Sequence, residues 1–351
     1  MTDLLAVRDL RLRFETEQGP VEVLDQVSLT IGRGQVVGLV GESGCGKTTL
    51  ARAILGILPP AARVLGGEIV FDGVDLLQAR PDTLDAEIRG RRISFVPQDP
   101  FGSLNPVFTL GAQVMELLKW KSPRAADRAH AHRRRGVPAL LRRYPGERRH
   151  ADRRAVIELL REAQIPDPEQ MLRKYPHQVS GGQRQRLLIA MALLVRPDLI
   201  IADEPTTALD VTIQAQILIL LRRLVKEHGV SVLFTTHDLG TAHEICDKVV
   251  VMYAGQEVEE APATAFFRDP RHPYTRRLLD SLPNPEGEIR DIPGEVPRLI
   301  DPPAGCRFHP RCPVASDDCR RTRPAVTAVA EGHSVRCYHP TVSTITVRSP
   351  A

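Results

Sequence analysis

A phosphate-binding loop is encoded by residues 41–48, "GESGCGKT", which fit the pattern G-x-x-x-x-G-K-[ST]. The glycines of such a loop let consecutive backbone N–H groups point at phosphate oxygens, and the helix that begins beside them adds its positive dipole end. We expect Lys47 to reach the β- and γ-phosphates and the Thr48 hydroxyl to bind Mg²⁺. The predicted nucleotide-binding residues are Gly41, Glu42, Ser43, Gly44, Cys45, Gly46, Lys47, Thr48 and Thr49.

An acidic pair, Asp203 and Glu204, ends the apolar stretch "LIIADE". A carboxylate at the end of a buried strand can hold Mg²⁺ directly or through water, which is the role expected of Asp203. Glu204 points differently and can polarise a water molecule for attack on the γ-phosphorus. Such a pair can also simply cap a turn, but its combination with a phosphate loop favours a nucleotide triphosphatase.

A second anion-binding helix start is predicted at "VSGGQRQR", residues 179–186. Ser180, Gly181 and Gly182 resemble the first phosphate cradle in design, but no lysine accompanies them. One chain rarely needs two cradles for one nucleotide. The economical interpretation is that the second cradle closes on ATP held by a neighbouring subunit.

The elements that must position these residues are indicated by apolar runs and breakers. Residues 35–40, 198–203 and 230–237 predict buried strands, and the long pattern "DVTIQAQILILLRRLVKEHG" predicts a helix closed by Gly229. The helix after the phosphate loop is expected to be stopped by Pro59 and Pro60. Strands that alternate with helices indicate an α/β domain with a largely parallel core sheet.

Taken together, the motifs resemble the ATP-binding-cassette (ABC) family over about residues 4–260, with Gln98 after "VP", "ALD" at 208–210 and His237 as further matches. The resemblance implies that Gln98 senses Mg²⁺ and water, that Asp210 lies at a dimer interface and that His237 contacts the γ-phosphate. It also implies that Glu204 is catalytic. The residues it implies for the partner's ATP are Ser180, Gly181, Gly182 and Gln183.

Two positions qualify the resemblance. Phe14 is a candidate for stacking on adenine, and core packing is the alternative. Val179 opens the signature where the family usually has leucine, a conservative apolar exchange.

A narrower resemblance is carried by "QDPFGSLNP" (98–106), "ADEPTTALDVTIQAQIL" and "RHPYTRRLL", which are similar to the ATPase subunits of bacterial dipeptide/oligopeptide importers. It implies an ATP-hydrolysing subunit, with ATP and Mg²⁺, that powers peptide import. The implied partners are a second homologous ATPase subunit, two transmembrane permease subunits and an extracytoplasmic peptide-binding protein. The alternatives are import of another solute, such as a nickel chelate, and a non-transport ABC ATPase of DNA repair or translation.

The resemblance implies the fold of a P-loop ABC-type nucleotide-binding domain, with a RecA-like core and a helical subdomain. We place this domain at 1–265, its helical subdomain at about 99–190, and a small irregular cysteine-containing extension at 266–351. The start of the chain has charges and no apolar signal segment, and "LLIAMALLV" is far shorter than the ~20 residues of a membrane-spanning helix. We therefore expect a peripheral protein on the cytoplasmic face of the inner membrane.

A basic segment interrupts the helical subdomain at about 121–150. Residues 119–154 contain 13 Lys or Arg and three acidic residues, a local excess of +10, so the rest of the chain sums to −6. A nucleic-acid-binding patch is one interpretation. We favour a solvated insertion, because Tyr144 is the only tyrosine within it and no aromatic platform is interleaved; no nucleic-acid partner is expected. Contact with anionic lipid head groups is a further possibility.

Six cysteines raise two questions. Cys45 lies inside the phosphate loop, where a helix N-terminus should lower its pKa and favour the thiolate; a merely small residue is the alternative. The tail follows Cys306-x5-Cys312-x6-Cys319-x17-Cys337, and four thiolates in a cytoplasmic protein suit either Zn²⁺ or a [4Fe–4S] cluster. The resemblance to the peptide importers ranks a cluster first, then zinc, then no metal. Neighbouring arginines are expected to offset the charge of such a site.

Overall fold

The computed structural model describes residues 3–124, 143–207, 209–282 and 291–341. The chain divides into two compact units, residues 1–78 with 234–351 and residues 79–233. Helices and strands alternate along much of both units, so the predicted α/β class is confirmed. Among the described residues, no helix combines the length and apolar character needed to cross a bilayer.

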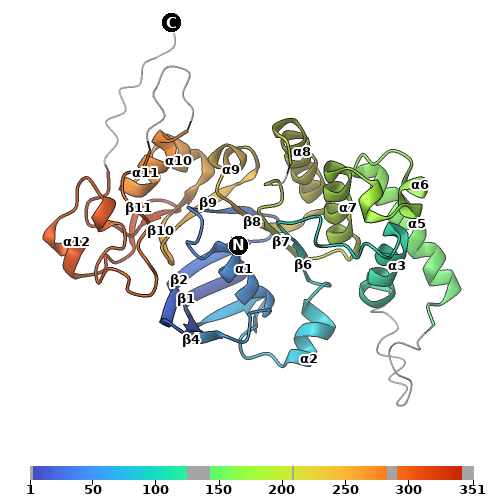
Figure 1. Ribbon diagram of the computed structural model, residues 1–351, viewed down its shortest axis with the longest axis horizontal. Helices are drawn as coiled ribbons and strands as arrows, with labels where there is room; N and C mark the ends of the chain where they lie inside the picture. Colours follow the sequence, from blue (N-terminus) through green and yellow to red (C-terminus); the bar gives the residue numbers. More distant parts are fainter. Residues whose placement is uncertain (1–2, 125–142, 208, 283–290, 342–351) are drawn as a thin grey trace, which may run out of the picture. The chain divides into compact units, whose positions relative to one another are not determined.

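The first unit contains an antiparallel sheet, drawn in blue in Figure 1, with the strand order β2-β1-β4-β5. Register shifts interrupt the pairing of β1 with β2. Leu5, Leu10 and Leu12 of β1 are fully buried. This sheet was not among the predicted elements. Its strands are β1 (Asp3–Thr16), β2 (Gly19–Gly32), β4 (Ala62–Phe71) and β5 (Val74–Asp75).

The first unit also contains part of a second sheet, in the order β11-β12-β10-β9-β3. β3 pairs in parallel with β9, whereas β10 and β12 continue the sheet in antiparallel fashion. Every residue of β3 is buried, as expected for a strand covered on both faces. The strands are β3 (Val36–Val40), β9 (Lys248–Tyr253), β10 (Gln256–Pro262), β11 (Thr327–Ala330) and β12 (His333–Val335).

Helices of the first unit follow the predicted phosphate loop and the later strands. The helix α1 ends at Gly56, which adopts a left-handed conformation (φ 64°), so the predicted stop at Pro59 is three residues too late. The helices are α1 (Lys47–Leu55), α9 (Leu239–Ile245), α10 (Ala263–Arg268), α11 (Pro273–Asp280), the 3₁₀ turn η4 (His309–Arg311) and α12 (Asp317–Arg321).

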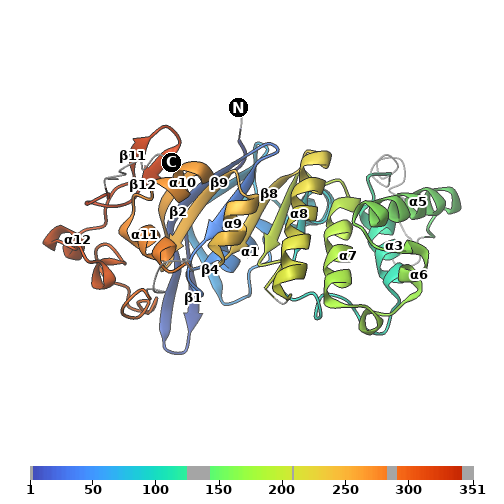
Figure 2. The same cartoon turned by 90° about the horizontal axis from the view of Figure 1, so that it is seen from above.

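The second unit combines two parallel strands with a group of helices, seen together as α3, α5, α6 and α7 in Figure 2. β6 (Ile93–Val96) pairs with β7 (Leu199–Asp203), and β8 (Ser231–Thr236) carries the chain back into the first unit. The helices are α2 (Pro81–Thr83), the π turn η1 (Leu84–Ile88), α3 (Leu110–Lys121), α5 (Gly146–Glu162), α6 (Pro168–Arg173), the 3₁₀ turn η3 (Pro176–Gln178), α7 (Gly181–Leu194) and α8 (Val211–His228).

The predicted helix before Gly229 is confirmed as α8, with Gly229 in a left-handed conformation directly after it. The predicted basic insertion is described at its two ends, and residues 125–142 lie outside the described residues. A fully buried carboxylate, Asp152, joins those ends by accepting hydrogen bonds from Ser122 Oγ (2.8 Å) and Tyr144 Oη (2.6 Å).

Candidate nucleotide site

The predicted phosphate loop lies between β3 and α1, as the motif requires. Glycine is needed where the loop turns tightly against its neighbours. Gly46 has φ 106°, and a Cβ there would lie 2.8 Å from Leu24 Cδ2. A Cβ on Gly41 would lie 2.2 Å from the carbonyl oxygen of Met252. The loop is therefore pressed against β2 and β9, which fixes the direction of its backbone groups.

Lys47 is the first residue of α1, and only 5% of its surface is exposed. Its ammonium donates to the carbonyl oxygens of Gly41 (2.7 Å) and Glu42 (3.2 Å). The loop thus wraps around a buried positive charge at the start of a helix. Thr48 and Thr49 follow in the first turn of the same helix. This arrangement offers an anion both a cation and the helix N-terminus.

The pKa of the Cys45 thiol is shifted in the direction opposite to the prediction. It is 1% exposed, and burial raises its pKa above the usual value for a thiol. The charge of Lys47 acts in the opposite direction but is the smaller effect. The expectation of a thiolate was wrong, because burial of the thiol outweighs the Lys47 charge and the backbone hydrogen bonds that lower its pKa.

In the second unit, Asp203 ends β7 and is 3% exposed. Glu204 follows with φ 44°, an uncommon conformation for a residue other than glycine. Gln98 Nε2 (3.1 Å) and Thr207 Oγ1 (3.1 Å) both donate to Glu204 Oε2. The structure therefore brings Gln98 and Glu204 together, and two hydrogen bonds orient the carboxylate that was predicted to act on water. Thr207 was not among the predicted residues.

The predicted second cradle begins α7. Ser180 caps this helix: its Oγ accepts a hydrogen bond from Gln183 N (3.2 Å), and Gln183 Oε1 accepts one from Ser180 N (3.2 Å). The reciprocal pair is a capping box, which defines where the helix starts. A Cβ on Gly182 would lie 2.8 Å from Ile213 Cγ2, so this position has no room for a side chain. Gly181 precedes it in the first turn.

Asp210 caps the neighbouring helix α8, with its Oδ1 accepting from Ile213 N (3.0 Å). Ala208, in the same "ALD" stretch, lies outside the described residues. In the first unit, His237 is exposed directly after β8, and Phe14 is half-buried on β1. These placements leave both side chains outside the fully buried core.

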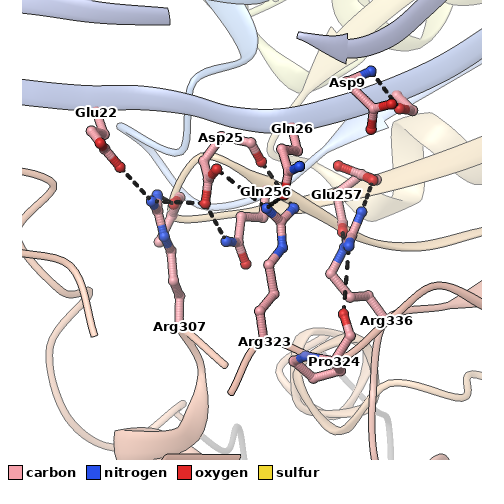
Figure 3. Close-up of polar contacts among 12 residues, drawn as sticks. Asp9, Glu22, Asp25, Gln26, Gln256, Glu257, Arg307, Arg323, Pro324 and Arg336 are labelled. Carbon is pink, nitrogen blue, oxygen red and sulfur yellow. Dashed lines mark hydrogen bonds and ion pairs between the residues drawn. The ribbon is translucent and has the colours of Figure 1, made fainter. Parts of the chain in front are cut away.

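The C-terminal region is joined to the cassette by arginines that were expected to balance thiolate charge. Arg307 pairs with Asp25 (3.2 Å), Arg323 donates to Gln26 Oε1 (2.6 Å), and Arg336 pairs with Glu257 (Figure 3). The carboxylates belong to β2 and β10, so these arginines serve as anchors to the two sheets. A fourth arginine of the region, Arg311, reaches the phosphate loop at Glu42.

The four tail cysteines are free thiols. Burial, with a smaller effect of the neighbouring thiols, raises the pKa of Cys306 to about 11 and that of Cys337 to about 12. Across the described residues, however, no group of three or more His, Cys, Asp or Glu side chains is arranged to hold a metal ion. The prediction of a [4Fe–4S] cluster or Zn²⁺ at these cysteines has no support from the geometry.

Comparison with known proteins decides the family. The family described as "ABC transporter" matches residues 24–207, and the family described as "Oligopeptide/dipeptide transporter, C-terminal region" matches residues 258–319. The chain belongs to the ABC transporter family. This ABC ATPase therefore has the phosphate loop, acidic pair and signature of an enzyme that hydrolyses ATP.

Three curated relatives are similar to this ABC ATPase over nearly their whole length. A probable peptide ABC transporter ATP-binding protein, y4tR of Sinorhizobium fredii, is 43% identical over 95% of this chain and 94% of its own. The dipeptide transport ATP-binding protein DppD is 41% identical in Escherichia coli, over 96% of this chain and 97% of its own, and 41% identical in Bacillus subtilis, over 96% and 95%.

Two solved structures share the fold. The ATP-binding cassette MJ0796, solved as a dimer bound to ADP and Pi, is 28% identical with a TM-score of 0.59, over 74% of this chain and 98% of its own. CbiO1 from Clostridium perfringens is 27% identical with a TM-score of 0.57, over 76% and 91%. These similarities confirm the predicted ABC-type fold for the part of the chain that they cover.

Proposed function

We propose that this chain is the ATP-hydrolysing subunit that powers import of di- or oligopeptides through a membrane ABC transporter. The observation that carries the proposal is similarity along the whole chain: relatives described as peptide or dipeptide transport ATP-binding proteins align over 95–96% of it. The match of residues 258–319 to the oligopeptide/dipeptide transporter region supports it independently of the nucleotide motifs.

The residues of the phosphate loop and the acidic pair have separate roles in the proposal. Lys47 and the backbone N–H groups of residues 41–49 bind the phosphates, and Thr48, Gln98 and Asp203 hold Mg²⁺ when it is bound. The ion offsets the charge of the β- and γ-phosphates. Glu204 accepts a proton from the attacking water, and Gln98 orients the Glu204 carboxylate through the 3.1 Å hydrogen bond.

Dimerisation completes the site in this proposal. Ser180, Gly181, Gly182 and Gln183 bind the γ-phosphate of ATP held by a second, homologous ATPase subunit, so a heterodimer forms around two nucleotides. His237 contacts the γ-phosphate and Asp210 lies at the interface. The dimer of the similar cassette MJ0796 supports this arrangement. ATP then acts as the ligand that shifts the pair between open and closed states.

Attachment to two permease subunits places the chain at the cytoplasmic face of the inner membrane, and an extracytoplasmic peptide-binding protein delivers the solute. The stretch after Gln98 offers a docking surface, because Phe101, Val107 and Phe108 are 56%, 72% and 54% exposed. Apolar side chains of this size in one exposed stretch are typical of a protein contact.

Co-purification tests the assembly. The tagged chain is extracted from membranes in detergent, and its partners are identified by mass spectrometry. We expect two permeases and a second ATPase; recovery with nucleic acid or ribosomes in their place would contradict the proposal. A Phe108→Asp variant should lose the permeases. The matched control is Ile219→Asp, since Ile219 is 68% exposed on α8 and lies outside the proposed docking stretch; it should retain them.

A metal at the four tail cysteines stays a separate proposal, supported by the spacing Cys306-x5-Cys312-x6-Cys319-x17-Cys337 in the sequence. No step of ATP hydrolysis depends on it. Iron, sulfide and zinc are measured after anaerobic purification of the full chain. About four irons per chain would support the cluster. One zinc per chain would show a Zn²⁺ site and no cluster, and absence of both metals would reject a metal site.

A further inference from the structure

A side chain of the C-terminal region reaches directly into the phosphate loop. Arg311, on η4, makes a bidentate ion pair with Glu42: Nη1 lies 2.8 Å from Oε2, and Nη2 lies 3.2 Å from Oε1. The Arg311 side chain is 4% exposed and that of Glu42 is 27% exposed. This is the fork-to-fork geometry in which arginine binds a carboxylate most strongly.

Both partners of this pair are held in place by further contacts. Arg311 also donates to the carbonyl oxygens of Ile292 (3.1 Å) and Pro293 (3.1 Å), so contacts outside the phosphate loop also hold its guanidinium. The Glu42 backbone N–H donates to Tyr274 Oη (3.1 Å). The second residue of the phosphate loop is therefore bound at its side chain and at its backbone by residues that follow β10.

Three aromatic rings pack together beside the Arg311–Glu42 pair. Tyr253 lies 4.6 Å from Tyr274 and 5.2 Å from Phe308, measured between ring centroids, and Tyr274 lies 5.3 Å from Phe308. All three are essentially inaccessible to solvent. The Arg311 guanidinium also donates to Tyr253 Oη (3.3 Å). Rings packed this closely have little freedom, so the position of Arg311 is set by the docking of the C-terminal region.

The negative charge of Glu42 explains how the ion pair with Arg311 would affect ATP binding. Glu42 sits inside a loop whose purpose is to hold the negative phosphates of ATP, and an unpaired carboxylate there would repel them. A buried arginine paired in this way neutralises the carboxylate and fixes its direction.

We propose that Arg311 is a positioning residue for ATP binding, because it holds Glu42 and neutralises its charge. The phosphate loop then binds ATP with its full affinity only when the C-terminal region is docked. This assignment concerns nucleotide affinity and does not depend on which solute is imported.

The test measures the Kd of Mg-ATP for the purified full-length chain. Arg311→Gln should weaken ATP binding about tenfold, a coupling within the range of contacting charged residues. Arg311→Lys keeps the charge but loses the bidentate geometry, so an intermediate loss of affinity is expected. It also serves as the second variant if Arg311→Gln fails to fold, as judged by thermal unfolding.

A double-mutant cycle separates positioning from mere docking. In a Glu42→Gln background the carboxylate is absent, so the further effect of Arg311→Gln should shrink to less than about twofold. An equal loss of affinity in both backgrounds would overturn the proposal, because it would mean that Arg311 acts only through the fold.

Arg336→Gln is the matched control, because Arg336 anchors the same region through Glu257 on β10 and not through Glu42. It should lower the thermal stability and leave the Kd of ATP within about twofold. If Arg336→Gln weakened ATP binding as much as Arg311→Gln, the specific assignment to Arg311 would be rejected.

Discussion

The substitution Ser180→Ala separates a structural role of the signature from a catalytic one. In this chain, Ser180 Oγ accepts one hydrogen bond, 3.2 Å from Gln183 N, and lies at the start of α7. Loss of such an N-cap costs about 1 kcal/mol of stability. If Ser180 also donates to the γ-phosphate of the partner's ATP, the transition state loses a donor that is worth a factor of about 10²–10³ in rate.

The two effects are measured on different molecules. Thermal unfolding of the purified chain reports the cap, and the Kd of ATP for the same chain reports its own phosphate loop, which the substitution leaves untouched. ATP hydrolysis by the assembled transporter reports the partner's site. We expect a small loss of stability, an unchanged Kd and a large loss of hydrolysis at the partner's nucleotide.

Thr109→Ala is the matched control, since Thr109 caps α3 in the same way, with Oγ1 3.3 Å from Ala112 N. It should cost a similar stability, about 1 kcal/mol, with hydrolysis unchanged. The reasoning fails if Ser180→Ala reduces hydrolysis no more than Thr109→Ala does.

Two further predictions follow from the buried side chains of Cys45 and His272, and a third from the close approach of Gly182 to Ile213. Native chain should resist maleimide at Cys45, because burial raises its pKa; modification within minutes, located by mass spectrometry, would contradict this. Burial lowers the pKa of His272 to about 4, so the unfolded chain binds a proton that the folded chain does not. The free energy of unfolding should therefore be unaffected by His272 above about pH 6.5 and fall by about 3 kcal/mol toward pH 4. In chemical unfolding, His272→Asn should remove this fall. Gly182→Ala should lower the unfolding temperature and hydrolysis, since its Cβ would lie 2.8 Å from Ile213; normal hydrolysis would show that α7 has room to move.

Much of the fold was predictable because its signals are local. Buried strands such as β3 are continuous apolar runs, and Gly229 ends α8 through its own left-handed conformation. The first sheet was missed because bulges between Val7 and Leu12 interrupt the alternation of β1. The end of α1 was misplaced because the left-handed Gly56 stops it before the prolines can act.

The candidate site was predictable where a motif specifies both chemistry and context. Gln98 and Glu204 are 106 positions apart and meet in the structure at 3.1 Å. The pairing of Arg311 with Glu42 could not be predicted, because it joins positions 269 apart and "HPRCP" has no pattern that specifies a partner. Cys45 was misjudged for the same reason: the helix start is visible in the sequence, but the burial of the thiol depends on distant segments.

The central claim is that ATP hydrolysis at Glu204 drives peptide import, and it is tested most directly in proteoliposomes. These contain the two permeases, both ATPase subunits and the binding protein, and uptake of a radiolabelled dipeptide is measured with Mg-ATP. The account predicts ATP-dependent uptake with the native chain and, for Glu204→Gln, retained ATP binding with uptake lost. Equal uptake by the native and Glu204→Gln transporters, or no ATP-dependent uptake of any peptide, would contradict it.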